Sequence, residues 1–169
     1  MTTPDGMLVA ASMPFEPGKI NLADRRHIKE AIRTLDFSVG EYIVGRLSKA
    51  QSINYTYPVR DADGKLAAIV IAAFRLDEYN RYLARIELPE DCVVGLIDHK
   101  GVRLFRWPEN DAAAVGKPIR REIFEHISGS LDQGTFDRVS DDGTKRLYAF
   151  KQLLLHKDAP PYHYVFVGV

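Results

Sequence analysis

Two hydrophobic periodicities alternate along the chain and predict an α+β fold. Apolar residues recur at helical spacing in segments 23–35, 76–86 and 119–128. Asn21 or Asp24 is expected to cap the first of these helices. Apolar or alternating runs bounded by turn-forming residues predict strands over 7–12, 37–44, 52–59, 65–74, 93–98, 102–107, 134–140, 145–155 and 162–169.

The order of these elements repeats. A strand, a helix and three strands are followed by a linking helix, then by two strands, a helix and three strands. This is one pattern written twice, with the first copy lacking its opening strand. We therefore predict two modules, residues 1–86 and 87–169, each a mostly antiparallel sheet flanked by helices. The turn at Pro4-Asp5-Gly6 comes directly before a strand, with three residues ahead of it. Since such a turn usually joins two strands, we expect the chain to be a fragment.

Composition limits the classes of function. The chain has 169 residues, 46% hydrophobic and 27% charged, which is enough to bury a core and excludes wholesale disorder. Its 23 basic and 23 acidic side chains balance, which argues against a nucleic-acid partner. The single cysteine, Cys92, excludes an internal disulfide and a Cys-rich zinc site. No apolar run approaches the roughly 20 residues that a membrane helix needs.

Catalytic signatures are missing from the sequence. The five histidines form no i, i+4 pair and no HExxH motif, and there is no GxSxG, Walker or GxGxxG sequence. We predict a non-enzyme that holds no metal and no cofactor. A hydrolase whose site is assembled only in space stays as a distant alternative.

A set of short motifs resembles a known family. The first half carries Thr3-Pro4-Asp5-Gly6, Asn21-Leu22-Ala23-Asp24-Arg25, Val39-Gly40-Glu41 and Tyr57-Pro58-Val59-Arg60-Asp61-Ala62-Asp63-Gly64. The second half carries Leu88-Pro89, Leu96-Ile97-Asp98-His99-Lys100-Gly101, Val115-Gly116-Lys117-Pro118, Arg146-Leu147-Tyr148-Ala149-Phe150 and Tyr164-Val165-Phe166-Val167-Gly168-Val169. In this order and spacing they closely resemble the double Cache (PDC-like, PAS-related) sensor domains. Those are the extracytoplasmic input domains of bacterial and archaeal histidine kinases, diguanylate cyclases and chemoreceptors.

The resemblance implies a place and a role for each module. The first would be membrane-distal and hold a small-molecule pocket between its sheet and its helix. The second would be membrane-proximal and relay the signal. Family members normally begin with a transmembrane helix, a stalk helix and a first strand, none of which this chain contains. The resemblance thus implies the periplasmic part of a membrane-anchored parent, which could form a homodimer.

Arg25 is the leading candidate for ligand binding. It stands at the predicted helix start, where a guanidinium and the first N–H groups of the helix could together hold a carboxylate. It also matches the arginine of the family's Asp-Arg-x-Tyr-Phe pattern. The alternative is a surface arginine paired with Asp24 or Glu41. His27 stands where the family usually has an aromatic residue and could assist Arg25 in a pH-sensitive way, or be an exposed helix residue.

The resemblance also indicates the ligand class. The amino-acid-binding branch has Arg-x-Trp-Tyr, where this chain has Arg25-Arg26-His27-Ile28. That branch also has an aspartate on the last strand for the amine, at a position that falls on Ala73 or Phe74. An amino-acid ligand is therefore disfavoured, and a carboxylate without an amine is expected.

Aromatic residues complete the predicted site. We expect Tyr42, Tyr55 and Tyr57 to line one wall of the pocket and Phe74 to cap it, although aromatic residues on strands are often plain core. In the second module, Asp98, Arg106, Trp107 and Tyr148 could border another pocket, but a packed module is favoured. The sequence thus predicts a small-molecule sensing domain. The alternative is a ligand-free module for protein interaction or dimerisation.

Overall fold

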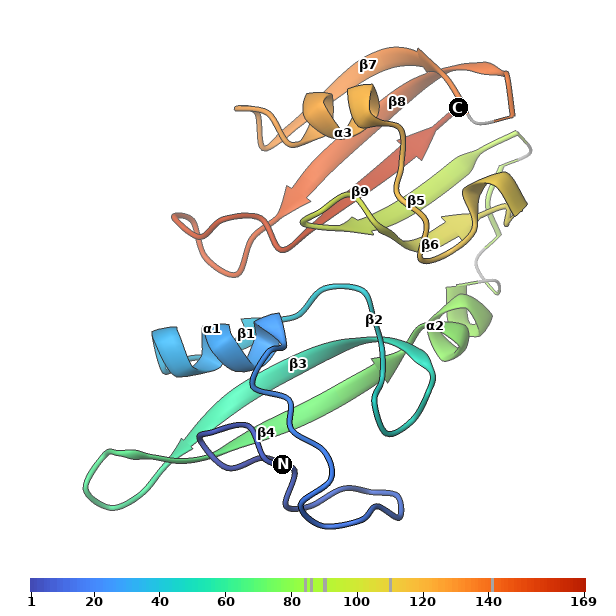
Figure 1. Ribbon diagram of the computed structural model, residues 1–169. Helices are drawn as coiled ribbons and strands as arrows, with labels where there is room; N and C mark the ends of the chain where they lie inside the picture. The colour runs from blue at the N-terminus through green and yellow to red at the C-terminus, as the bar shows by residue number, and fades with distance from the viewer. Residues whose placement is uncertain (84, 86, 90, 110, 141) are drawn as a thin grey trace. The chain divides into compact units, whose positions relative to one another are not determined.

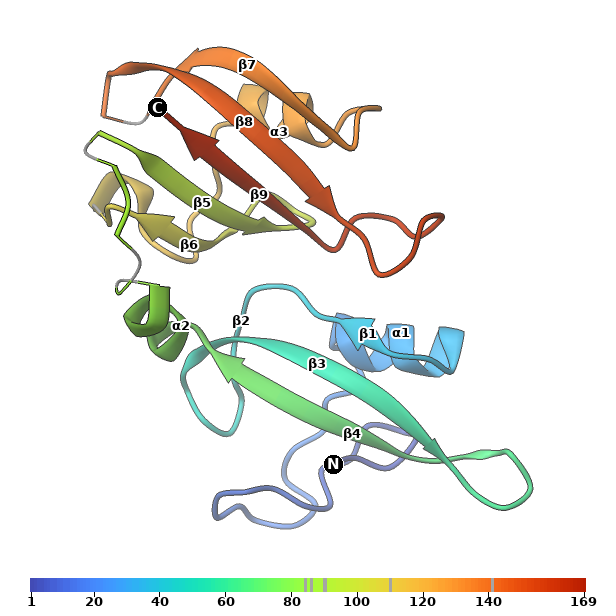
Figure 2. The same ribbon diagram turned by 180° about the vertical axis from the view of Figure 1, so that it is seen from behind.

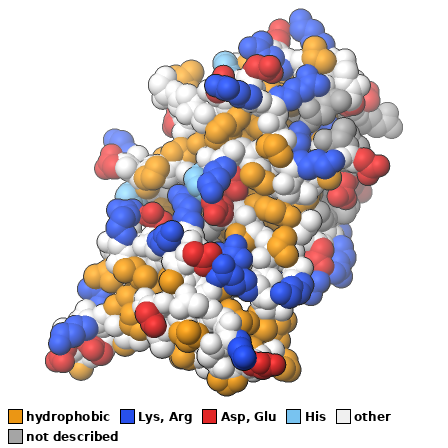
Figure 3. Space-filling model, viewed as in Figure 1, with side chains coloured by type: hydrophobic (Ala, Val, Ile, Leu, Met, Phe, Trp, Pro, Cys, Tyr) orange, Lys and Arg blue, Asp and Glu red, His pale blue; other side chains and the backbone are white. Residues whose placement is uncertain are grey.

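The computed structural model describes residues 1–83, 85, 87–89, 91–109, 111–140 and 142–169. The chain divides into two compact units, which we call unit 1 (Met1–Arg75) and unit 2 (Leu76–Val169). Each unit contains one antiparallel sheet with few helices, as predicted (Figure 1). No helix in the described part of the chain is long and apolar enough to cross a membrane. On the face seen in Figure 3, basic and acidic side chains are interspersed.

The sheet of unit 1 is built around one long strand. Strand β3 (Gln51–Arg60) pairs along its length with β4 (Leu66–Arg75). Its other edge pairs with two short strands, β1 (Ser38–Val39) and β2 (Ile43–Val44). The sequence predicted a single strand over 37–44. The structure breaks it after Val39, where Gly40 N–H still donates to the Asn54 carbonyl before the chain leaves the edge.

Helix α1 (Arg26–Thr34) covers the inner face of this sheet. Ile28 and Ala31 pack against Ile69 of β4 in the core. The His27 carbonyl accepts hydrogen bonds from the hydroxyls of Ser38 and Thr56, each at 2.9 Å, and these fix the helix to β1 and β3. The predicted caps are wrong. The helix begins after Arg25, whose side chain makes no capping hydrogen bond. Neither expected residue caps it, because Asn21 accepts a hydrogen bond from the Ala23 N–H and Asp24 pairs with Arg46.

The predicted strand over residues 7–12 is also wrong. Thr2, rather than this segment, occupies the free edge of β4, exchanging two 2.9 Å backbone hydrogen bonds with Ile69. Met7 and Leu8 form only isolated bridges, to Asn21 and Thr2. With the sheet edge taken, the residues after Leu8 form no ladder of their own.

Unit 2 has a five-stranded sheet in the order β6-β5-β9-β8-β7. The strands are β5 (Val93–Asp98), β6 (Arg103–Trp107), β7 (Gln133–Val139), β8 (Lys145–Leu153) and β9 (His163–Gly168), close to the predicted segments. The helices are α2 (Leu76–Leu83), the short 3₁₀ helix η1 (Asp111–Ala113) and α3 (Arg121–Ile127). Residues 84 and 86 of the predicted linking helix, and residue 141 of a predicted turn, lie outside the described residues.

The core of unit 2 is aromatic. Helix α3 contributes Ile127, and the strands contribute Phe136, Tyr148, Phe150, Tyr164 and Phe166. Their rings contact one another at centroid distances such as 5.3 Å for Phe136 and Tyr148. Figure 2 shows the opposite side of this sheet, away from α3.

Candidate functional site

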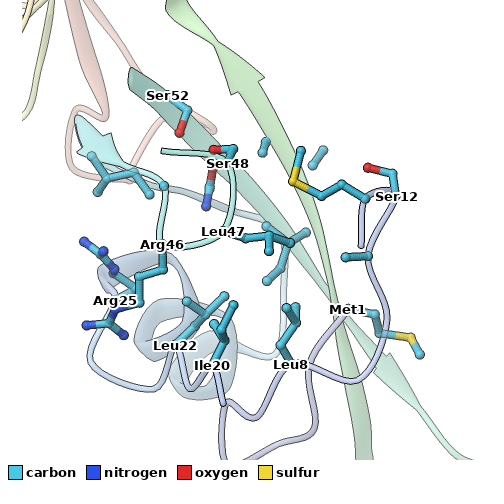
Figure 4. Close-up of a pocket in the computed structure, with 18 of the residues that line it drawn as sticks. Met1, Leu8, Ser12, Ile20, Leu22, Arg25, Arg46, Leu47, Ser48 and Ser52 are labelled. Carbon is cyan, nitrogen blue, oxygen red and sulfur yellow. The ribbon is translucent and has the colours of Figure 1, made fainter. Parts of the chain in front are cut away.

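Unit 1 contains a cavity of about 350 Å³. Helix α1, the inner face of β3 and β4, the loop between β2 and β3, and the N-terminal segment enclose it (Figure 4). Arg25 and Arg46 lie beside each other at one end in this view, while Leu8 and Met1 lie toward the other. The lining is Met1, Leu8, Ala10, Ala11, Ser12, Met13, Ile20, Leu22, Arg25, His27, Ile43, Gly45, Arg46, Leu47, Ser48, Ser52, Asn54, Ile71, Ala72 and Ala73.

Arg25 supplies a positive charge to this cavity that no ion pair among the described residues holds in place. Its Nη2 donates only a long hydrogen bond, 3.4 Å, to the Val44 carbonyl, and its buried Nε has no partner. It does not pair with Asp24, as the alternative expected. Because no side chain caps α1, the partial positive charge of the helix N-terminus adds to that of the guanidinium. This end of the cavity therefore favours an anion.

Arg46 contributes less charge, because Asp24 neutralises it. Its Nη1 and Nη2 donate to the two Asp24 oxygens at 2.6 and 2.7 Å, and Nη1 also donates to the Asn21 carbonyl. These hydrogen bonds from Arg46 lower the pKa of Asp24. Among the described residues no Asp or Glu lines the cavity itself. The lining itself thus carries Arg25 and no carboxylate, whereas Asp24 and Glu41, outside the lining, act on Arg25 and His27 without touching the cavity.

His27 lies inside the site rather than on the surface, since its side chain is only 1% exposed. Burial, with the nearby Arg25 charge, lowers the pKa of His27 to about 4, so the ring is neutral at pH 7. The Asn54 amide nitrogen lies 3.3 Å from Nε2, so the two side chains form a buried polar pair. Both Nδ1 and the Asn54 Oδ1 are buried without a partner. Two residues of the lining therefore hold unused hydrogen-bonding capacity.

Aliphatic side chains line much of the remaining cavity. Leu8 and Ile20 come from the N-terminal segment, Leu22 from the turn before α1, and Ile71 from β4. A pocket with a charged end and an apolar wall suits a small ligand that has both a polar group and a hydrocarbon part.

The predicted aromatic residues do not line this cavity. Tyr55 and Tyr57 share a face of β3, as expected, but it is the face turned away from Ser52 and Asn54. Tyr57 is 58% exposed, and Phe74, on the same outer face of β4, is 42% exposed. Tyr55 stacks on Phe37 with ring centroids 6.0 Å apart. Tyr42 lies half-buried in the connection between β1 and β2.

The polar residues that do line the cavity were not predicted from the sequence; they are chiefly Ser52, Asn54, Arg46 and Ser48. A signal for two of them was present. Ser52 and Asn54 share one face of a strand predicted to have two distinct faces, and the structure buries both of them, which is unusual for polar side chains. Ala73 pairs with Asn54 and lines the cavity, whereas Phe74 points to the other face. The position expected for an amine-binding aspartate thus falls on alanine.

A much smaller space lies on the inner face of the unit 2 sheet. Val93, Arg103, Arg106, Ile119, Ile123, Ser140, Tyr148 and Phe166 border a space of only about 20 Å³. Asp98, one of the candidates, uses a carboxylate oxygen to accept the Lys100 and Val102 N–H groups and so shapes a turn. No group of three or more His, Cys, Asp or Glu residues in the described ranges could hold a metal ion.

Comparison with known proteins connects this fold to sensor domains. No family model and no curated protein matches the chain. Among solved structures, the extracellular domain of the histidine kinase rpHK1S-Z16 is similar over 99% of this chain and 67% of its own, with 19% identity and a TM-score of 0.77. The ligand-binding domain of the Pseudomonas fluorescens chemoreceptor CtaA, in complex with L-serine, gives 16% identity, 99% and 70% coverage, and a TM-score of 0.70.

A third structure, the periplasmic sensory domain of the Campylobacter jejuni chemoreceptor Tlp1, has 15% identity and a TM-score of 0.66. The similarity covers 88% of this chain, which spans 55% of that one. At these identities the likeness concerns the fold. The chain thus shares its fold with extracellular and periplasmic sensory domains of a histidine kinase and of chemoreceptors, in line with the resemblance seen in the sequence.

Proposed function

We propose that this chain is the extracytoplasmic sensing domain of a membrane-anchored receptor, and that unit 1 binds a small carboxylate beside Arg25. The observation that carries the proposal is the cavity, which combines the Arg25 guanidinium with a lining that has no described acidic residue. The fold shared with extracellular and periplasmic sensory domains supports the location and the sensing role.

The ligand's carboxylate would lie between the Arg25 guanidinium and the uncapped first turn of α1. Its hydrocarbon part would contact the aliphatic wall that includes Leu8 and Ile20. A hydroxyl group on the ligand would satisfy the Asn54 Oδ1, which has no partner in the protein. An amino acid would bind less well, because its ammonium group would meet Ala73 and Arg25 rather than a carboxylate.

A thermal-shift screen tests the proposal with matched ligands. The test ligands are acetate, propionate, lactate and succinate. Propionamide, which is similar in size but uncharged, and alanine, whose ammonium group balances its carboxylate, are the controls. A true ligand raises the melting temperature in proportion to ln(1 + [L]/Kd). We expect one or more carboxylates to stabilise the protein, propionamide to have no effect, and lactate to exceed propionate.

Variants then locate the site. Arg25→Gln should weaken binding of the best carboxylate by about tenfold or more, because it removes a charge-assisted hydrogen bond. Arg33→Gln is the matched control, since Arg33 lies on the same helix but pairs with Glu30 at the surface. Failure of every carboxylate, or equal loss in both variants, would contradict the proposed site.

A second candidate function is self-association through the outer face of the unit 1 sheet. Four exposed apolar side chains favour it: Phe37, Tyr57, Val70 and Phe74. Sedimentation equilibrium over a wide concentration range separates the two candidates. A dimer that Tyr57→Ser disrupts, together with no response to any carboxylate, would favour self-association over ligand sensing.

A further inference from the structure

Strand β6 of unit 2 places two arginines on the inner face of the sheet. Arg106 lies opposite Gly95 of β5, and Arg103 lies opposite Ile97. Gly95 and Ile97 share a face, because successive residues of a strand alternate. A register shift between Leu96 and Ile97 adds one residue to β6, so that both arginines reach the face on which Ile97 joins the core.

Gly95 shapes the space next to Arg106. A Cβ at this glycine would lie 2.1 Å from Cζ of Phe166, so the Phe166 ring occupies the room that a side chain would need. Phe166 and Arg106 both border the cavity of about 20 Å³, together with the hydroxyl-bearing residues Ser140 and Tyr148. A space of this size holds a single small species rather than an organic ligand.

Arg106 brings a buried positive charge to this cavity. Its side chain is 5% exposed, and among the described residues Nη1 donates a hydrogen bond to the Pro108 carbonyl. The buried Nη2 has no partner. A guanidinium stays protonated at any ordinary pH, and a buried charge without a counter-charge is strongly unfavourable. Within the described ranges no acidic residue lines the cavity.

We propose that unit 2 binds one monoatomic anion of chloride size between Arg106 and the residues Ser140 and Tyr148. A water molecule could satisfy the Nη2 donor, but only an anion also neutralises its charge. The apolar remainder of the lining, including Val93 and Ile119, excludes the water shell that a larger or more strongly hydrated anion would keep. This site is separate from the carboxylate site of unit 1 and does not depend on it.

Halide titration of the whole chain tests the proposal. Sodium chloride or bromide replaces sodium methanesulfonate at constant sodium concentration while thermal unfolding is followed. We expect a saturable rise in melting temperature of about 3 °C or more. Arg106→Gln should abolish this rise, whereas Arg138→Gln should keep it, since Arg138 is an exposed arginine on β7. Arg25→Gln should also keep it, which separates the halide from any effect on unit 1.

An equal response in the Arg106→Gln and Arg138→Gln variants, or no saturable response at all, would overturn the proposal. Should Arg106→Gln not fold, crystals of the unaltered chain grown in sodium bromide decide the question. An anomalous difference peak at hydrogen-bonding distance from the Arg106 guanidinium supports the anion site. Density for water alone, without bromide signal, overturns it.

Discussion

The two units place a helix against one face of an antiparallel sheet, yet unit 1 keeps a cavity of about 350 Å³ and unit 2 one of only about 20 Å³. The difference lies in the side chains on that face. In unit 1 the sheet presents Ser52, Asn54 and Ala73 to the space beside α1. In unit 2 the equivalent surface carries the aromatic core residues Tyr148, Phe150 and Phe166. Side-chain volume, rather than topology, thus accounts for the difference between these two cavities.

The largest expected effect comes from emptying the core of unit 2. Phe150→Ala removes a buried ring that contacts Phe136 and should lower the free energy of unfolding by about 3–5 kcal/mol. Urea unfolding followed by the fluorescence of Trp107, the single tryptophan, reports on unit 2. Phe74→Ala in unit 1 is the control, since the partly exposed ring should leave this transition unchanged. A small effect of Phe150→Ala would refute the contrast between a packed and a hollow unit.

The next effect is a pH dependence that belongs to unit 1. His27 has a pKa of about 4 in the folded chain, against 6.5 for the ordinary side chain. As the pH falls below 6.5 the unfolded chain takes up this proton first, so the free energy of unfolding should decline until about pH 4. The total loss is on the order of 3 kcal/mol.

Urea unfolding at a series of pH values measures this loss. His27→Gln should flatten the decline, whereas His156→Gln, at an exposed histidine of unit 2, should leave it unchanged. A decline of equal size in the His27→Gln variant would show that another group is responsible.

A smaller effect on stability, with a large effect on binding, is expected from filling the cavity. Ala73→Phe places a ring beside Asn54 and gives unit 1 the kind of inner face that unit 2 has. Extra atoms in a packed core cost about 1–3 kcal/mol, and because this ring enters empty space we expect the free energy of unfolding to fall by only about 1 kcal/mol. The thermal shift caused by the best carboxylate should disappear. Ala149→Phe, on the exposed side of β8, should leave that thermal shift intact. If both variants lose the thermal shift, the carboxylate does not bind in the cavity of unit 1.

Much of the fold could be predicted from the sequence, because its strands carry strong local signals. The strand pair β3 and β4 and all five strands of unit 2 lie within a few residues of their predicted segments. The errors fall where a long-range contact overrides local preference. The segment after Met7 has strand-like residues, but Thr2 already occupies the edge of β4. Asp24 has the chemistry of a helix cap, but its carboxylate binds Arg46.

The candidate site was predictable only in part. Arg25 and His27 line the cavity, as expected. They could be predicted because the start of a helix is set by local sequence. Alternation along β3 also groups Tyr55 with Tyr57, but it does not say which face of the strand meets the helix. The aromatic face was expected to line the pocket, but the structure places Ser52 and Asn54 there instead. Arg46 and Ser48 reach the cavity through a loop, whose path no periodicity predicts.

The most direct test of carboxylate binding in unit 1 is a crystal structure of the chain with the most stabilising carboxylate from the thermal-shift screen. The account predicts density in the cavity of unit 1, with the carboxylate oxygens at hydrogen-bonding distance from the Arg25 guanidinium and the hydrocarbon part against Leu8 and Ile20. A carboxylate bound elsewhere in the molecule, or one that leaves Arg25 without a contact, would contradict it.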